Sequence, residues 1–186
     1  MSCDATNDVT PEHCVCRTLV LGCGNRLFGD DGFGPAVAQR LDEMRSPPPG
    51  MCAIDVGTSV RTVLFDVLLG PTRPKRVVIV DAVDMGRQPG EVWAIAADEL
   101  PEIKLDDFSM HQMPTSNLLR ELNDLAGVEV TCVVGQVSAF PPEVRPGLSA
   151  PMRLGVDRAA EIVLNMCRRG GELASSAASG ADSVPR

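Results

Sequence analysis

Five short apolar runs, separated by segments with helical spacing, constrain the fold of this chain more than any other feature. The runs are rich in residues that favour β-strands and fall at residues 17–22, 51–56, 75–82, 91–97 and 128–137. Apolar residues recur at helical spacing over residues 33–44, 60–68, 115–125 and 152–168. Strands that alternate with helices predict an α/β fold: a twisted, mostly parallel sheet flanked by helices on both faces, in a single three-layer domain.

The length of 186 residues fits one domain, which buries roughly 70% of the surface of its unfolded chain. We expect this domain over residues 16–169. The polar residues 1–15 are expected to form a disordered N-terminal extension, and the Gly-, Ser- and Ala-rich residues 170–186 a disordered tail.

Charge and hydropathy restrict the partners. The formal net charge of −8 argues against nucleic acid, whose phosphates require clustered positive charge. No apolar run reaches the roughly 18 residues of a membrane helix, and the N-terminus does not read as a signal sequence. We therefore expect no membrane partner and a cytoplasmic protein, with most of its seven cysteines present as buried thiols.

Acidic residues gather where the predicted strands end. Ligands of parallel sheets bind at the carboxyl ends of the strands. Asp31 follows the first strand, Asp55 stands near the end of the second, and Asp81 ends the third. With His111, the carboxylates Asp31 and Asp81 predict a divalent-metal site with open positions, because nickel and zinc accept two oxygen ligands and one nitrogen ligand. Asp30 is instead expected to cap the helix that follows it.

Other interpretations of these segments are open at this point. The turn after the first strand favours a dinucleotide site, but the third glycine of the GxGxxG pattern would fall on Leu27. His111 is also compatible with an ordinary loop position, and nothing specific supports a Cys23–His111 nucleophile. The segment over residues 141–147, rich in proline, is a candidate contact for a substrate chain.

Four motifs together resemble the nickel-iron hydrogenase maturation endopeptidases. They occur in that family's order over residues 17–168, most closely as in the branch that serves deazaflavin-reducing hydrogenases. The motifs are Gly22-x-Gly24-Asn25-x-Leu27-x-x-Asp30-Asp31-Gly32-x-Gly34, Asp55-x-Gly57-Thr58, Val80-Asp81-Ala82 and Met110-His111-Gln112.

This resemblance implies an aspartic-type endopeptidase that removes the C-terminal extension of a hydrogenase large-subunit precursor after nickel insertion. It implies nickel-ligand roles for Asp31, Asp81 and His111. The nickel is expected to be the precursor's own, so that the isolated protein holds none or another divalent cation. Either Asp31 or Asp81 acts as a general base, or nickel activates the carbonyl or a water.

Two other functions compete with this one. A non-catalytic assembly partner that checks the precursor for nickel would use the same three residues, and a cleavage assay separates it from a protease. A dinucleotide-binding oxidoreductase would require a bound nicotinamide cofactor.

Overall fold

The computed structural model describes residues 16–96, 119, 122–124 and 126–178, with side chains up to residue 168. His111 and most of the helix predicted after residue 115 lie outside these residues. The elements, in chain order, are β1 (Thr18–Cys23), η1 (Gly29–Gly32), α1 (Phe33–Asp42), β2 (Met51–Gly57), α2 (Val60–Leu69), β3 (Arg76–Val83), β4 (Val92–Ala96), β5 (Glu129–Gln136) and α4 (Ala150–Ala178).

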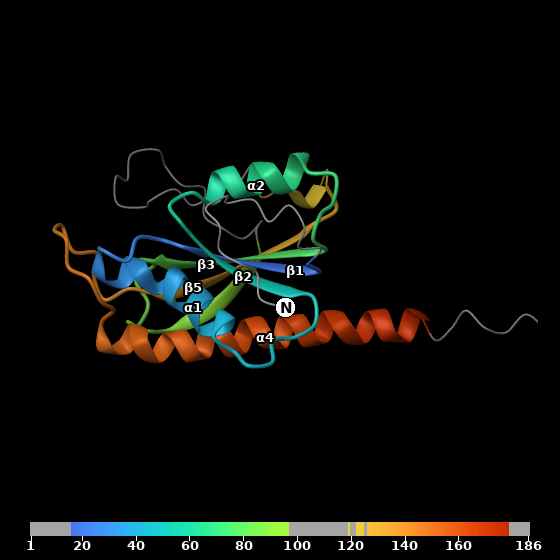
Figure 1. Ribbon diagram of the computed structural model, residues 1–186. Helices are drawn as coiled ribbons and strands as arrows, with labels where there is room; N and C mark the ends of the chain where they lie inside the picture. Colours follow the sequence, from blue (N-terminus) through green and yellow to red (C-terminus); the bar gives the residue numbers. More distant parts are fainter. Residues whose placement is uncertain (1–15, 97–118, 120–121, 125, 179–186) are drawn as a thin grey trace, which may run out of the picture.

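The five strands form one sheet in the order β2-β1-β3-β5-β4. All neighbouring pairs are parallel except β4 with β5, which is antiparallel. The predicted α/β fold with a mostly parallel sheet is thereby confirmed. Helix α2 covers one face of the sheet, and α1 and α4 cover the other (Figure 1).

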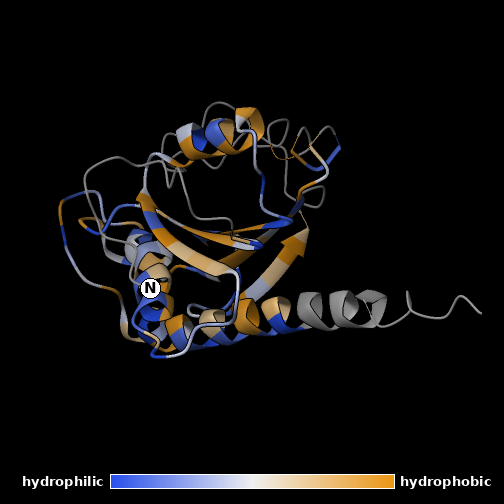
Figure 2. Cartoon of the chain, turned by 45° about the vertical axis from the view of Figure 1, so that its right-hand side comes forward, coloured by the Kyte–Doolittle hydropathy of each residue, from blue (hydrophilic) through white to orange (hydrophobic). Residues whose placement is uncertain are grey.

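Apolar side chains fill both spaces between the sheet and its helices. On one face, Val60, Val63 and Leu64 of α2 pack against the sheet. On the other, Phe33 of α1 and Met152 of α4 do so. Hydrophobic colouring therefore runs along the strands, whereas the helices alternate between hydrophobic and hydrophilic residues (Figure 2). The loops that follow β1, β3 and β5 meet at one end of the molecule.

Helix α4 differs from its predicted bounds. It was predicted over residues 152–168, but it begins at Ala150 and ends at Ala178. Its last residues therefore occupy part of the segment 170–186 that was predicted to be disordered. This segment contains several alanines, which have the highest helix propensity, and each added residue extends an existing helix by one hydrogen bond. Among the described helices, none is long and apolar enough to cross a bilayer.

Candidate active site

The carboxyl ends of β1 and β3 bring two acidic side chains together. These strands are parallel neighbours, and Gly22 pairs with Val80. Asp81 is the next residue of β3, and Asp31 lies in η1, which follows β1 after the loop over residues 24–28. Both carboxylates are buried. The structure therefore places Asp31 and Asp81 at the same edge, whereas the predicted roles of these two residues and of His111 stay predictions.

A tight turn after β1 delivers Asp31 to this edge. Gly24 has a φ of 120°, and a Cβ atom at this position would overlap the backbone carbonyl oxygen of Asp31. The next residue, Asn25, donates its backbone N–H to Oδ2 of Asp31 at 2.7 Å. Glycine at this position thus allows the turn to pack against the backbone of Asp31. The hydrogen bond from Asn25 then holds the Asp31 carboxylate directly.

Helix α1 also approaches the sheet unusually closely. A Cβ atom at Gly34 would overlap the carbonyl oxygens of Cys23 and Val80. The two strand ends and the first turn of α1 are therefore packed backbone to backbone. Two buried acids, Asp30 and Asp31, stand just before this helix, where a dinucleotide would place its phosphates. This arrangement disfavours the oxidoreductase interpretation.

Asp81 is a buried carboxyl group at the end of β3. Its Oδ1 accepts the backbone N–H of Ala82 at 2.8 Å. The pKa of Asp81 is raised to about 7, mainly by burial and in smaller part by the charge of Asp31, while the hydrogen bond from the Ala82 N–H acts to lower it. Near neutral pH, Asp81 is therefore able to hold or release a proton.

Asp30 does not cap α1 as predicted. Helix α1 has Gly32 at its N-cap and no side-chain cap hydrogen bond. The Asp30 carboxylate instead accepts the backbone N–H groups of Ser138 at 2.9 Å and Ser149 at 2.7 Å, and the hydroxyl of Ser149 at 2.9 Å. Ser149 in turn caps α4, since its Oγ accepts the N–H of Met152. Asp30 therefore joins η1 to both ends of the loop after β5, contacts that no local sequence pattern indicates.

An Asp30→Ala variant is expected to lower the free energy of unfolding by about 2–4 kcal/mol. The change removes one charged acceptor from three donors at once. Urea denaturation measures the effect. The matched control is Asp157→Ala, which removes an exposed carboxylate paired with Arg40 and should cost less than about 1 kcal/mol. Equal costs for the two variants would contradict this role of Asp30.

Asp55 lies at the edge of the same region and is exposed. Its Oδ2 accepts Nε of Arg26 at 3.0 Å, and its Oδ1 accepts the N–H of Gly57 at 3.0 Å. Arg26 also donates to Gln39 and to the carbonyl of Pro35. Asp55 thus anchors the loop after β1 to β2. This contact supports the wall of the site.

Cys23 is packed rather than reactive. Its thiol is buried and donates a weak hydrogen bond to the carbonyl of Leu21 at 3.7 Å. Burial raises the pKa of Cys23 well above its usual value, and the charge of Asp81 raises it further. Burial likewise raises the pKa of Cys132 to about 12, with Asp81 as the second cause. Because the thiolate is the nucleophile, neither cysteine is suited to attack a peptide.

Iodoacetamide at pH 8 is therefore expected to leave Cys23 and Cys132 unmodified in the folded protein. Both should react once urea has unfolded the chain. Peptide mapping by mass spectrometry after a timed exposure reports each position separately. Modification of Cys132 in native protein at the rate seen in urea would contradict the buried-thiol assignment.

Gln136 is a buried residue of this edge that sequence reasoning missed. Its Oε1 accepts the N–H groups of Met85 and Arg87, and its Nε2 donates to Asp84 and to the carbonyl of Val137. The side-chain amide thus fixes the loop between β3 and β4. The sequence did contain a signal for this role, a lone glutamine at the end of an apolar run. A side-chain amide that is buried there requires hydrogen-bond partners.

The chemistry of the edge follows from the two carboxylates. Among the residues that the structure describes, no group of three His, Cys, Asp or Glu side chains forms a complete metal site. Two buried carboxylates whose charges repel each other favour an added cation or a shared proton. The arrangement can therefore supply two oxygen ligands or a general base, but it needs a further donor to hold a metal.

Comparisons with known proteins agree on one family. The family model for hydrogenase maturation protease matches residues 35–166. A protein of Methanocaldococcus jannaschii named as a hydrogenase maturation protease is 38% identical over 152 residues, which cover 81% of this chain and 96% of the relative. The delta subunit of the coenzyme F420 hydrogenase of Methanothermobacter thermautotrophicus is 35% identical, with 79% of this chain and 92% of the relative covered.

A solved structure shares the fold. The hydrogenase maturating endopeptidase HybD from Escherichia coli superimposes with a TM-score of 0.68 and 26% identity, over 83% of this chain and 94% of that one. The family predicted from the four motifs is confirmed, including its branch, since coenzyme F420 is a deazaflavin. This chain belongs to the hydrogenase maturation protease family.

Proposed function

We propose that this chain is the endopeptidase that removes the C-terminal extension of a nickel-iron hydrogenase large-subunit precursor after nickel insertion, and that it recognises the inserted nickel. The observation that carries the proposal is the pair of buried carboxylates, Asp31 and Asp81, at the carboxyl ends of β1 and β3. Membership of a protease family supports the hydrolytic activity. The Escherichia coli protein that shares the fold is named a hydrogenase maturating endopeptidase, and this name supports hydrogenase maturation as the process in which the chain acts. The cytoplasm as its location stays a prediction.

The carboxylate pair suits a divalent cation that arrives with the precursor. Oδ1 of Asp81 accepts the Ala82 N–H, and among the described residues no hydrogen bond to its Oδ2 exists. Asp31 is fixed through Asn25. A cation between the two groups would relieve their repulsion, and His111 would add the nitrogen ligand that nickel accepts. In this proposal the nickel remains bound to the precursor and is part of the substrate.

Hydrolysis of the extension then requires proton movements that these residues can perform. Water attacks the scissile carbonyl carbon and loses a proton, the C–N bond breaks, and the leaving amine gains a proton. Asp31 or Asp81 can accept and return this proton. Nickel in the precursor can instead polarise the carbonyl oxygen. Under either route, nickel positions the peptide at the carboxylates, so that cleavage depends on metal loading.

The test is the intact mass of a nickel-loaded precursor, with and without the protein. We expect loss of a C-terminal fragment with the parent protein, and no loss from a nickel-free precursor. Asp31→Asn, Asp81→Asn and His111→Ala should each prevent the loss. The matched control is Asp42→Asn, which changes an exposed acid at the end of α1 and should cleave normally.

The competing functions predict different results. An unchanged mass despite a stable complex with the loaded precursor would identify a nickel-checking partner without protease activity. Cleavage of loaded and nickel-free precursor at equal rates would leave the protease but contradict nickel recognition.

A further inference from the structure

Two apolar side chains stand exposed beside the loop that carries Asp31. Leu27 is 50% exposed and Val144 is 63% exposed. They come from loops distant in the sequence that pair through a parallel bridge between Phe28 and Arg145. The N–H of Arg145 donates to the carbonyl of Leu27 at 2.8 Å, so the backbone of Leu27 lies beside that of Val144. We call these two residues the Leu27–Val144 patch.

The backbone beneath the patch is held firmly. The N–H of Leu27 donates to Oδ1 of Asn25 at 3.0 Å, and its carbonyl accepts the N–H of Arg145 at 2.8 Å. The N–H of Gly29 donates to the carbonyl of Arg145 at 2.8 Å. An exposed leucine on such a loop is not the result of a loose chain. An apolar side chain held in place before binding loses little conformational entropy when a partner covers it.

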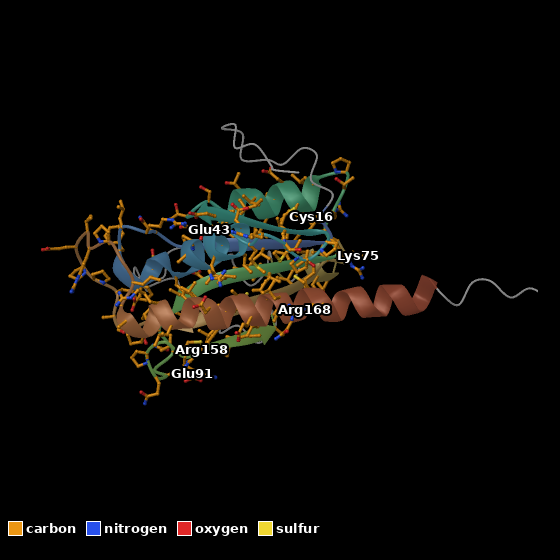
Figure 3. All side chains as sticks on the ribbon, turned by 60° about the horizontal axis from the view of Figure 1, so that its bottom comes forward. Cys16, Glu43, Lys75, Glu91, Arg158 and Arg168 are labelled. Atoms are coloured by element: carbon orange, nitrogen blue, oxygen red, sulfur yellow. The ribbon has the colours of Figure 1, made fainter. Side chains whose placement is uncertain are left out.

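The patch and the carboxylates form one connected unit. Asn25, which holds Leu27 through its side chain, holds Asp31 through its backbone N–H. Asp30 binds Ser138 and Ser149 at the two ends of the loop that carries Val144. Both loops lie at the end of the molecule where α1 and α4 begin (Figure 1). Side chains project from the loop after β5 away from the body of the protein, far from Lys75 at the opposite end (Figure 3).

We propose that the Leu27–Val144 patch docks the folded body of the large-subunit precursor, through an apolar area of its surface, and so presents the scissile peptide to Asp31 and Asp81. This inference rests on the proposed function. We assign the precursor as the partner because the patch adjoins the loop that carries Asp31. A protein that brings its nickel to Asp31 therefore approaches the loops that carry the patch. A rigid apolar anchor beside the reaction site gives binding energy to a large partner without entering the chemistry.

The experiment measures the initial rate of cleavage as a function of the concentration of nickel-loaded precursor. For a Leu27→Asp/Val144→Asp double variant, we expect the half-saturating concentration to rise at least tenfold, with a much smaller change in the rate at saturation. Leu27→Ala/Val144→Ala should change it in the same direction by less. The control is Leu69→Asp, because Leu69 is 79% exposed at the end of α2, where the chain returns to the start of β3. Its half-saturating concentration should stay within twofold of the parent value.

Circular dichroism melts establish that each variant is folded. A folded aspartate double variant with the concentration dependence of the parent would overturn the docking proposal and leave the proposed function intact. If the parent binds the loaded precursor but does not cleave it, the proposed function fails and docking is decided by affinity. In that case, at least tenfold weaker binding by the double variant supports the patch, and unchanged binding overturns it.

Discussion

An Asp81→Asn variant is expected to be more stable than the parent protein at pH 8 and yet to cleave the nickel-loaded precursor at least about 100-fold more slowly. The amide can still accept the Ala82 N–H through its oxygen, so the local geometry has an equivalent partner. It carries no negative charge, binds nickel poorly and accepts no proton from water. The Asp81 carboxylate would thus lower the stability of the protein and at the same time be required for cleavage.

The pH dependence distinguishes this explanation from a change in packing. The pKa of Asp81 is raised to about 7 in the folded protein from 3.8, mainly by burial. Between these values the folded state binds more protons than the unfolded state, so the free energy of unfolding falls as the pH rises from about 4 to about 7. Above pH 7, the raised pKa of Asp81 lowers the free energy of unfolding by at most about 4 kcal/mol. The asparagine variant lacks this contribution.

Urea denaturation of both proteins at pH 4 and pH 8, with a chelator present, measures the difference. We expect the parent to lose more stability than Asp81→Asn between the two pH values. Asp42→Asn is the control for an exposed carboxylate and should follow the parent. An equal loss in the parent and in Asp81→Asn would show that the buried carboxyl is not responsible.

A Gly34→Ala variant is expected to lose at least about 3 kcal/mol of stability, although alanine is the better helix former. The added Cβ would overlap two backbone carbonyl oxygens, those of Cys23 and Val80. Neither belongs to a flexible side chain, so α1 would have to move away from the sheet. Such a movement would also displace η1 and the Asp31 carboxylate, and cleavage should fall with stability.

The matched control for Gly34→Ala is Gly86→Ala. Gly86 has a φ of 68°, and a Cβ atom there would meet nothing within 4 Å. Its replacement should cost only the backbone strain of a left-handed alanine, about 1–2 kcal/mol. Thermal melts of the two variants compare the costs. A smaller loss for Gly34→Ala than for Gly86→Ala would contradict the close packing of α1 on the sheet.

Much of this fold follows from local sequence patterns. The run over residues 75–82 differs from β3 by one residue at each end, and the helix predicted over 33–44 begins at the first residue of α1. Hydrophobic periodicity reports such elements because it depends on near neighbours in the sequence. The rule that ligands bind at the carboxyl ends of strands then predicted that Asp31 and Asp81 share one edge, and the parallel pairing of β1 with β3 places them there.

Contacts between distant segments could not be predicted in this way. The position of Asp30 before α1 predicts a helix cap. Its hydrogen-bond donors are instead Ser138 and Ser149, more than a hundred residues away in the sequence. Gln136 reads as a polar residue at the end of a strand, whereas its amide organises the loop after β3. The bridge between Phe28 and Arg145, which brings the loop of Leu27 to that of Val144, has no local signature in the sequence at all. Each depends on which loops the finished sheet brings side by side.

The segment between β1 and α1 has a fixed length. The N–H of Gly24 donates to the carbonyl of Gly57, that of Phe28 to Asn25, and that of Gly29 to Arg145. Surface loops usually tolerate inserted or deleted residues, but one residue more or less here would break these contacts in turn and move Asp30 and Asp31 out of position together. Relatives that keep this site should therefore differ in length elsewhere, while the count of residues from Cys23 to Phe33 stays constant.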